Sequence, residues 1–186
     1  MELILTNVRV GFPRVFEPET YKESTAFSIK AFIETGSAQD AKIREAIKSE
    51  AMAKWPKKWE FMLKEFSMDK KAFCYIDGDR TEFNHPENTW ILTARRKDTD
   101  GRPMVVDQRK NPLAETDGKP YAGCYCNVKV EIYAQDGDNK GVRCGLIAVQ
   151  FVKDGESFGG AKPATADGFD DLGDTGGSST AGDDFF

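Results

Sequence analysis

Apolar and polar residues alternate in several segments of this sequence, and a period of two restricts those segments to strands that bury one face. The clearest run covers residues 25–34. One face of this strand carries Phe27, Ile29, Ala31 and Ile33. The other face carries Ala26, Ser28, Lys30, Phe32 and Glu34. The apolar set is predicted to face a hydrophobic core. The side chains of Lys30 and Phe32 are predicted to lie on the opposite face.

Further segments have the length and composition of strands, and turn residues separate most of them. They are Leu3–Val10, Ala72–Ile76, Thr89–Arg96, Met104–Asp107, Gly123–Ala134 and Val142–Val152. Gly11 and Pro13 are predicted to end the first. Asp77-Gly78-Asp79 and Asp100-Gly101 are predicted turns, because Asp-Gly beside apolar runs favours hairpins. In the last hairpin, Ile132 is predicted to pair with Val142. That register places Val130 opposite Cys144, Val128 opposite Leu146, Cys126 opposite Ala148 and Glu131 opposite Arg143.

One helical insertion interrupts the strands. Residues 39–54 place Ile43, Ala46, Ile47 and Ala51 at helical spacing, and Trp55-Pro56 redirects the chain into a second helical segment that ends near Phe66. The apolar stripe Trp55, Trp59, Met62, Leu63 and Phe66 is predicted to dock this segment on the strands. Strands in hairpin order with a helical insertion predict a mainly β protein with a small closed or partly closed barrel. An oligonucleotide-binding (OB-fold-like) barrel is the commonest such architecture that binds nucleic acid.

The last 27 residues, 160–186, have a different composition. They contain six Asp, six Gly and one Lys without apolar periodicity, which predicts a disordered acidic tail. Their net charge of −5 equals that of the whole chain, so residues 1–159 form a neutral domain. The terminal residues Asp183, Asp184, Phe185 and Phe186 favour docking into a basic, apolar pocket of another protein. A purely solubilising tail is the alternative.

A neutral domain can bind a polyanion where Lys and Arg gather on one face. Several aromatic and basic residues share predicted strand faces: Lys30 with Phe32, and Tyr125, Lys129 and Tyr133 with Arg143 on the neighbouring strand. Bases stack on rings while cations neutralise phosphates, so this mixture predicts a groove for single-stranded nucleic acid. The alternative is that the rings pack beneath the helix, because Ile147, Val149 and Phe151 share the predicted Tyr125 face.

The densest basic stretch of the domain is residues 93–111. It contains Arg95, Arg96, Lys97, Arg102, Arg109 and Lys110. A hairpin of this composition can clamp a phosphate backbone, and a solvated hairpin tip is the alternative.

Metal and catalytic patterns are weak. The predicted register places Cys144 about 13 Å along the sheet from Cys126, which is too far for a shared zinc ion, so the four Cys are predicted to be buried thiols. Asp77, Asp79 and Asp107 leave a metal-dependent nuclease or resolvase as an alternative. The sequence has no phosphate-binding loop of Walker type, nucleophile elbow, secretion signal or apolar stretch near 18 residues. It therefore predicts a non-enzyme without cofactor or metal, located in the cytoplasm and not in a membrane.

Motifs along most of the chain resemble a known family, and those of the C-terminal half are the most specific. Tyr121-Ala-Gly-Cys-Tyr-Cys-Asn127, the pattern of residues 141–156, Asp77-Gly-Asp79, Trp90-x-Leu-x-Ala94 and Val105-Val-Asp107 are similar to phage single-stranded DNA-binding proteins. The resemblance implies an oligonucleotide-binding barrel that coats single-stranded DNA during phage replication, and an acidic tail that engages replication partners. The preference for DNA over RNA rests on it. The cellular counterpart usually ends in Asp-Asp-x-Pro-Phe, whereas this chain lacks that Pro.

The predicted function is to coat single-stranded DNA without sequence specificity in replication or recombination, in the host cytoplasm if the chain is phage-encoded. The tail is predicted to recruit replication or recombination proteins. A protein-interaction module that does not bind DNA is a further alternative. The candidate DNA-binding residues are Lys30, Phe32, Trp90, Arg95, Arg96, Lys97, Arg102, Arg109, Lys110, Tyr125, Lys129, Tyr133 and Arg143.

Overall fold

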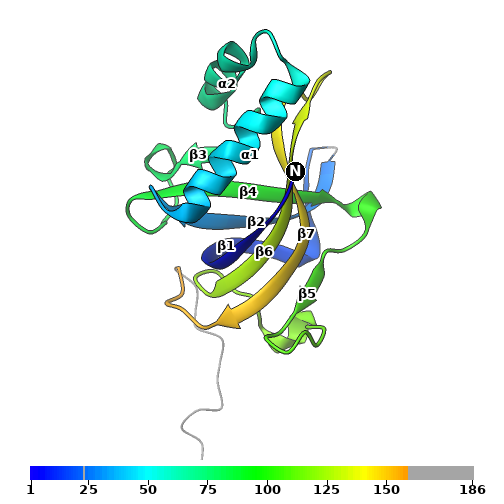
Figure 1. Ribbon diagram of the computed structural model, residues 1–186. Coiled ribbons are helices and arrows are strands. Elements are labelled where there is room, and N and C mark those ends of the chain that lie inside the picture. The colour runs from blue at the N-terminus through cyan, green and yellow to red at the C-terminus, as the bar shows by residue number, and fades with distance from the viewer. Residues whose placement is uncertain (23, 159–186) are drawn as a thin grey trace, which may run out of the picture.

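The computed structural model describes residues 1–22 and 24–158, which form a mainly β domain (Figure 1). In chain order its strands and α-helices are β1 (Glu2–Tyr21), β2 (Ser24–Glu34), α1 (Ala38–Lys54), α2 (Trp59–Met68), β3 (Tyr75–Asp77), β4 (Thr89–Lys97), β5 (Met104–Val106), β6 (Tyr125–Gln135) and β7 (Gly141–Lys153). Short 3₁₀ turns occupy Gly78–Arg80, Asp98–Asp100 and Glu115–Asp117. The predicted tail, 160–186, lies outside the described residues.

Five strands close into a barrel. The sheet order is β3-β4-β2-β1-β6-β7-β5, and an additional pairing of β4 with β7 completes the ring. That closing contact is parallel and joins Arg95 to Gly145. A closed barrel of five strands is the architecture of the oligonucleotide-binding fold, so the predicted OB-fold-like barrel is confirmed.

Strand β1 is much longer than the sequence predicts. The expectation that Gly11 and Pro13 end it is wrong, because the strand continues to Tyr21. Its first part pairs with β6 and its later part with β2. Register shifts near these residues, together with positive φ angles at Asn7 (52°) and Phe12 (50°), let the strand bend from one partner to the other. Pro13 lies within such a register shift, where no hydrogen bond between the strands requires the backbone N–H that proline lacks.

The predicted register of the last hairpin is also wrong. Ile132 pairs with Cys144 instead of Val142, and the ladder continues to Gln135 opposite Gly141. The error is two residues, so the predicted faces of this part of the hairpin are unchanged. Tyr133, and not Glu131, therefore lies opposite Arg143.

A bulge then alters the second half of β7. Lys129 pairs with Ala148 and Val130 with Leu146, so Ile147 has no partner in the ladder. The extra residue reverses the alternation, and Val149 and Phe151 turn into the core with 1% and 3% of their surface exposed. The expectation that both share the face of Tyr125 is therefore wrong.

The two helices lie at one end of the barrel (Figure 1). Helix α1 buries the predicted stripe of Ile43, Ala46, Ile47 and Ala51 in the same core as the strands. Trp55, Met62 and Phe66 are also buried there, while Trp59 and Leu63 pack against its edge. The predicted docking stripe is thus confirmed. Ser37 begins α1 by accepting a hydrogen bond from the backbone N–H of Asp40.

Candidate nucleic-acid interface

The outward faces of β2 and β4 carry the largest group of predicted binding residues. Ile29, Ala31 and Ile33 point into the core, so the intervening side chains of β2 point outward. Lys30 pairs with Thr93, and Arg95 and Lys97 follow on the same face of β4. In the barrel these are the second and third strands, the face on which oligonucleotide-binding folds hold their ligands.

Lys30 lies beside a pair of aromatic rings. Its Nζ is 4.3 Å from the centroid of Phe83 and 5.2 Å from that of Phe12, and the two rings meet edge to face at 4.9 Å. Burial, followed by the charges of Arg95 and Lys70, lowers the pKa of Lys30. Phe12 is 48% exposed, so this cluster presents an accessible ring beside a cation.

A second group forms a row across three strands. Arg9 on β1 pairs with Phe32 on one side and with Tyr125 on the other. The guanidinium carbon of Arg9 lies 5.8 Å from the Tyr125 ring centroid, and Lys153 Nζ lies 4.6 Å from it. This row places one ring between two cations, the arrangement needed to stack a base and neutralise its phosphates.

The end of the described chain crosses this row. Phe158 meets the Phe32 ring at 5.3 Å, and Arg9 lies over Phe158 at 4.2 Å. Arg9 Nη2 also donates to the carbonyl of Glu156 at 2.6 Å, and the Phe158 N–H donates to the carbonyl of Ala122. With this segment in place Phe32 is only 4% exposed.

A groove of about 360 Å³ opens beside Phe32 and Tyr125. Its remaining lining comes from β1, the end of β2 and the start of α1, and the loop that leads into β4: Asn7, Val8, Arg9, Ile33, Glu34, Ser37, Gln39, Pro86, Glu87, Asn88 and Thr89. The groove therefore joins the aromatic row to the start of α1.

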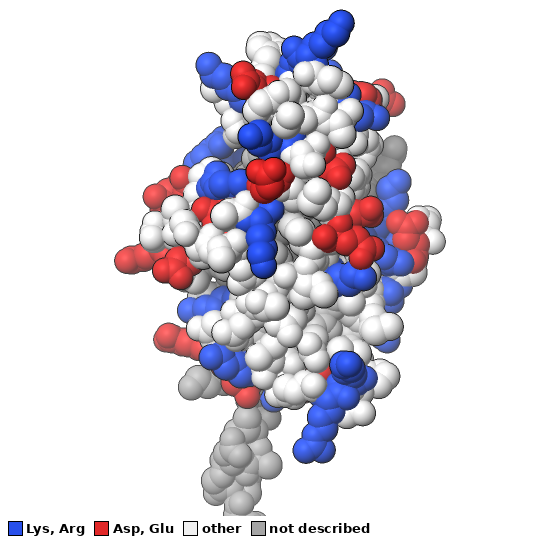
Figure 2. All heavy atoms as spheres, viewed as in Figure 1, with Lys and Arg blue, Asp and Glu red and all other residues white. Residues whose placement is uncertain are grey.

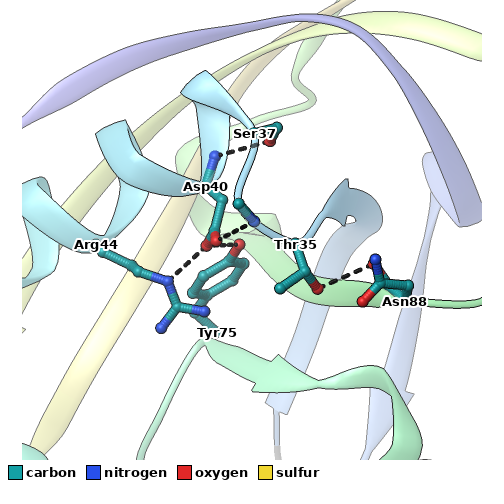
Figure 3. Close-up of polar contacts among 7 residues, drawn as sticks. Thr35, Ser37, Asp40, Arg44, Tyr75 and Asn88 are labelled. Carbon is teal, nitrogen blue, oxygen red and sulfur yellow. Dashed lines mark hydrogen bonds and ion pairs between the residues drawn. The ribbon is translucent and has the colours of Figure 1, made fainter.

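A polar network fixes the wall of the groove (Figure 3). Thr35 donates from both its backbone N–H and its hydroxyl to the carbonyl of Asn88, at 3.1 and 2.9 Å. The buried carboxylate of Asp40 accepts from the Gly36 N–H (2.9 Å), the Tyr75 hydroxyl (2.7 Å) and Arg44 Nε (2.6 Å). Burial opposes ionisation of Asp40, but these hydrogen bonds and the Arg44 charge outweigh it, so its pKa is lowered.

The structure brings only part of the predicted set together. Lys30, Phe32, Arg95 and Lys97 share the β2–β4 face, and Tyr125 joins Phe32 through Arg9. Trp90 pairs with Ile33, a core residue, and packs against the core. Its ring lies 5.2 Å from Tyr75 and beneath Arg44 at 4.2 Å, so it belongs to the α1 end of the barrel.

Several predicted cations are engaged elsewhere. Arg96 donates to the carbonyls of Gly101, Asp100 and Leu146, and Lys129 pairs with Glu2 at 2.9 Å. Arg143 donates to the carbonyls of Lys71 and Asn139. These contacts hold loops and strand ends together.

The remaining candidates lie away from the aromatic row. Tyr133 is eight residues from Tyr125 along β6, or about 26 Å at 3.3 Å per residue. Arg102 lies 5.6 Å from the Phe16 ring centroid, while the exposed residues Arg109 and Lys110 follow β5, which pairs with β7. Figure 2 shows acidic and basic side chains interspersed on the face that it views. That face therefore carries no continuous basic surface. The candidates Asp183, Asp184, Phe185 and Phe186 lie outside the described residues.

Sequence reasoning missed five residues of the interface: Arg9, Phe12, Phe83, Lys153 and Phe158. The outward direction of Arg9 could have been predicted, because Val8 and Val10 on either side of it are apolar. Its two ring neighbours could not, since they depend on how β1 pairs with two distant strands.

The residues proposed for metal chemistry have local roles. The Asp77 side chain accepts from the Asp79 N–H, and Asp107 accepts from Arg109 and Asn111. Cys124 and Cys126 have their sulfurs 3.6 Å apart. Within residues 1–22 and 24–158, no three His, Cys, Asp or Glu side chains are grouped so as to hold a metal ion.

Among the described helices, none has the length and apolar character needed to cross a membrane.

Comparison with solved structures supports the barrel assignment. The single-stranded DNA-binding protein from bacteriophage Enc34 is similar with a TM-score of 0.64 and 23% identity, over 91% of this chain and 90% of that chain. The same phage protein in complex with single-stranded DNA gives 0.63 and 21% identity, over 85% and 89% of the two chains. The single-stranded DNA-binding protein gp2.5 of bacteriophage T7 gives 0.54 and 11% identity, over 88% and 98%.

Sequence comparison establishes the family. Protein p50 of Acyrthosiphon pisum secondary endosymbiont phage 1 is 38% identical over 176 residues, which cover 92% of this chain and 94% of that protein. The model of the family described as Enterobacter phage Enc34, ssDNA-binding protein, matches residues 1–185. This match confirms the predicted resemblance and the prediction of a non-enzymatic protein: the chain belongs to the Enc34 family of phage single-stranded DNA-binding proteins.

Proposed function

We propose that this protein binds single-stranded DNA on the outward face of β2 and β4 and on the adjoining row of Arg9 and Tyr125. The observation that carries the proposal is this row, in which a ring lies between two cations beside Lys30 and Arg95. Rings hold bases regardless of sequence, and the cations displace counterions from phosphates. The family assignment supports DNA as the ligand.

Fluorescence anisotropy of a labelled oligothymidine tests this proposal. We expect affinity to fall as salt rises and to exceed the affinity for a duplex of the same length by at least about tenfold, because duplex bases cannot reach the rings. Equal affinity for single strands and duplex would contradict a stacking interface. Cleavage of the oligonucleotide in the presence of Mg²⁺ would instead favour the nuclease alternative.

We further propose that residues 160–186 recruit replication or recombination proteins to the coated strand. The support is their composition, with six carboxylates and two terminal Phe, and the position of Phe158 on the proposed DNA face. Their composition predicts a flexible chain, and a flexible chain of 27 residues has a root-mean-square reach of roughly 30 Å. The carboxylates can therefore compete with DNA for the same cations.

Two variants separate recruitment from competition. Deletion of residues 160–186 should tighten single-strand binding at low salt, with a gain that shrinks as salt rises. The same deletion should abolish capture of the phage or host DNA polymerase. Phe185→Ala with Phe186→Ala should lose capture but retain the low-salt competition, since all six carboxylates remain. A deletion that changes neither property would leave the segment as a solubilising tail.

A further inference from the structure

We propose that the groove beside Phe32 and Tyr125 is a nucleobase subsite that favours guanine over thymine. This inference rests on the proposed binding of single-stranded DNA to the adjoining face. The groove has a volume of about 360 Å³, which lies in the range of small-molecule sites. It is continuous with the Tyr125 ring, the proposed stacking surface, so a stacked base can turn its edge toward the groove.

Two carboxylates give this groove its chemical character. Glu34 and Glu87 both line it and are exposed. Among residues 1–22 and 24–158, neither carboxylate has a hydrogen bond or ion pair to another side chain or to the backbone. Two free carboxylates repel phosphate, so the DNA backbone is not expected to occupy this part of the surface. They accept hydrogen bonds, and they therefore select for a base edge rich in donors.

Guanine carries the donor pair that a carboxylate requires. Its N1–H and N2 amino group lie side by side on the Watson–Crick edge, which is free in a single strand, and a carboxylate can accept from both. Thymine offers one N–H between two carbonyl oxygens on the same edge, and a carboxylate facing that edge is repelled by those oxygens. Adenine and cytosine each offer one amino group beside a ring nitrogen that is an acceptor.

The backbone places the carboxylates close to the rings. Glu34 follows Phe32 by two residues on the same outward face of β2, a separation of roughly 7 Å. Glu34 also pairs with Thr89, which brings the loop that contains Glu87 to the same edge. A base that stacks on Tyr125 can therefore turn its edge toward the carboxylates, which line the same groove.

The wall that carries both carboxylates is held in position. Thr35, the residue after Glu34, is bonded twice to the carbonyl of Asn88, the residue after Glu87. The Gly36 N–H is bonded in turn to the buried Asp40 carboxylate (Figure 3). A wall fixed before the ligand arrives loses little conformational freedom on binding, which favours discrimination between bases.

Equilibrium binding of short oligonucleotides tests the proposal. The probe is an oligothymidine of the minimal bound length, compared with versions that carry one central dG, dA, dC or deoxyinosine. A single dG should tighten binding at least about fivefold, and dA and dC should have smaller effects. Deoxyinosine lacks the N2 amino group and should lose most of the gain.

The matched variants assign the preference to the two carboxylates. Glu34→Gln with Glu87→Gln should remove the preference for dG. Binding of plain oligothymidine should be retained or become tighter, because two groups that repel phosphates and the thymine oxygens are neutralised. Glu45→Gln with Glu60→Gln, two exposed positions on the helices, should leave it intact. Equal binding of dG and dT probes by the wild type, or a preference that persists in Glu34→Gln with Glu87→Gln, would overturn the subsite alone. Failure to bind plain oligothymidine would overturn the proposed function as well.

Discussion

Phe158 lies edge-on against Phe32, with ring centroids 5.3 Å apart and ring planes at 83°. Phe32 points away from the barrel core, yet it is 4% exposed. Arg9 holds the segment of Phe158 in place through its bond to the Glu156 carbonyl and its contact with the Phe158 ring. The last described residues of the chain therefore pack on the surface proposed to bind DNA.

Phe158→Ala should increase the affinity for oligothymidine by about 1 kcal/mol, because uncovering Phe32 adds a ring to the stacking surface. Anisotropy at constant salt measures the change. Phe158→Ala combined with Phe32→Ala should lose the gain, and Phe61→Ala, an exposed ring on α2, should have no effect. Weaker binding by Phe158→Ala would show instead that Phe158 itself stacks on a base.

Tyr125→Ala should weaken binding of oligothymidine by about 1–3 kcal/mol, the range for loss of one stacking ring. Tyr133→Ala is the matched control, since it removes a ring from the same strand at a distance from Arg9 and Lys153. Thermal unfolding of both variants checks that the barrel is intact. Equal losses for the two variants would mean that DNA follows the whole length of β6.

Lys30→Gln and Arg95→Gln should each reduce the slope of log affinity against log salt by about 0.7, the value for one phosphate contact on a single strand. Titrations with oligothymidine at four or more salt concentrations give the slope. Lys129→Gln should leave the slope unchanged, because Lys129 is paired with Glu2. An equal reduction in Lys129→Gln would argue that phosphate contacts surround the barrel.

Asp40→Asn should lower the free energy of unfolding at pH 7 by about 2–4 kcal/mol, because it weakens a buried network of charged hydrogen bonds. The pKa of Asp40 is lowered in the folded protein, so its ionised form stabilises the fold above the unfolded value near 4. This stabilisation is lost as pH falls through the folded pKa.

Urea unfolding at pH 7 and at pH 3 tests the Asp40 prediction. The difference between wild type and Asp40→Asn should narrow at the lower pH. Glu45→Gln, an exposed position on the same helix, should show little difference at either pH. An Asp40→Asn effect that does not depend on pH would assign the loss to packing and not to the charge.

The secondary structure and the core could be predicted because they depend on local periodicity. Alternation over residues 25–34 identified which side of β2 is buried, and helical spacing identified the stripe from Trp55 to Phe66. The same alternation predicted that Lys30 points outward.

The arrangement of the site depends on pairings between distant segments, which periodicity does not encode. The bulge at Ile147 reversed the predicted face of Val149 and Phe151, and the long bent β1 placed Arg9 between Phe32 and Tyr125. A strand's own residues determine which side is apolar. Its partner and register depend on the summed packing and hydrogen bonding of the whole barrel, so only the tertiary structure decided which outward rings and cations meet.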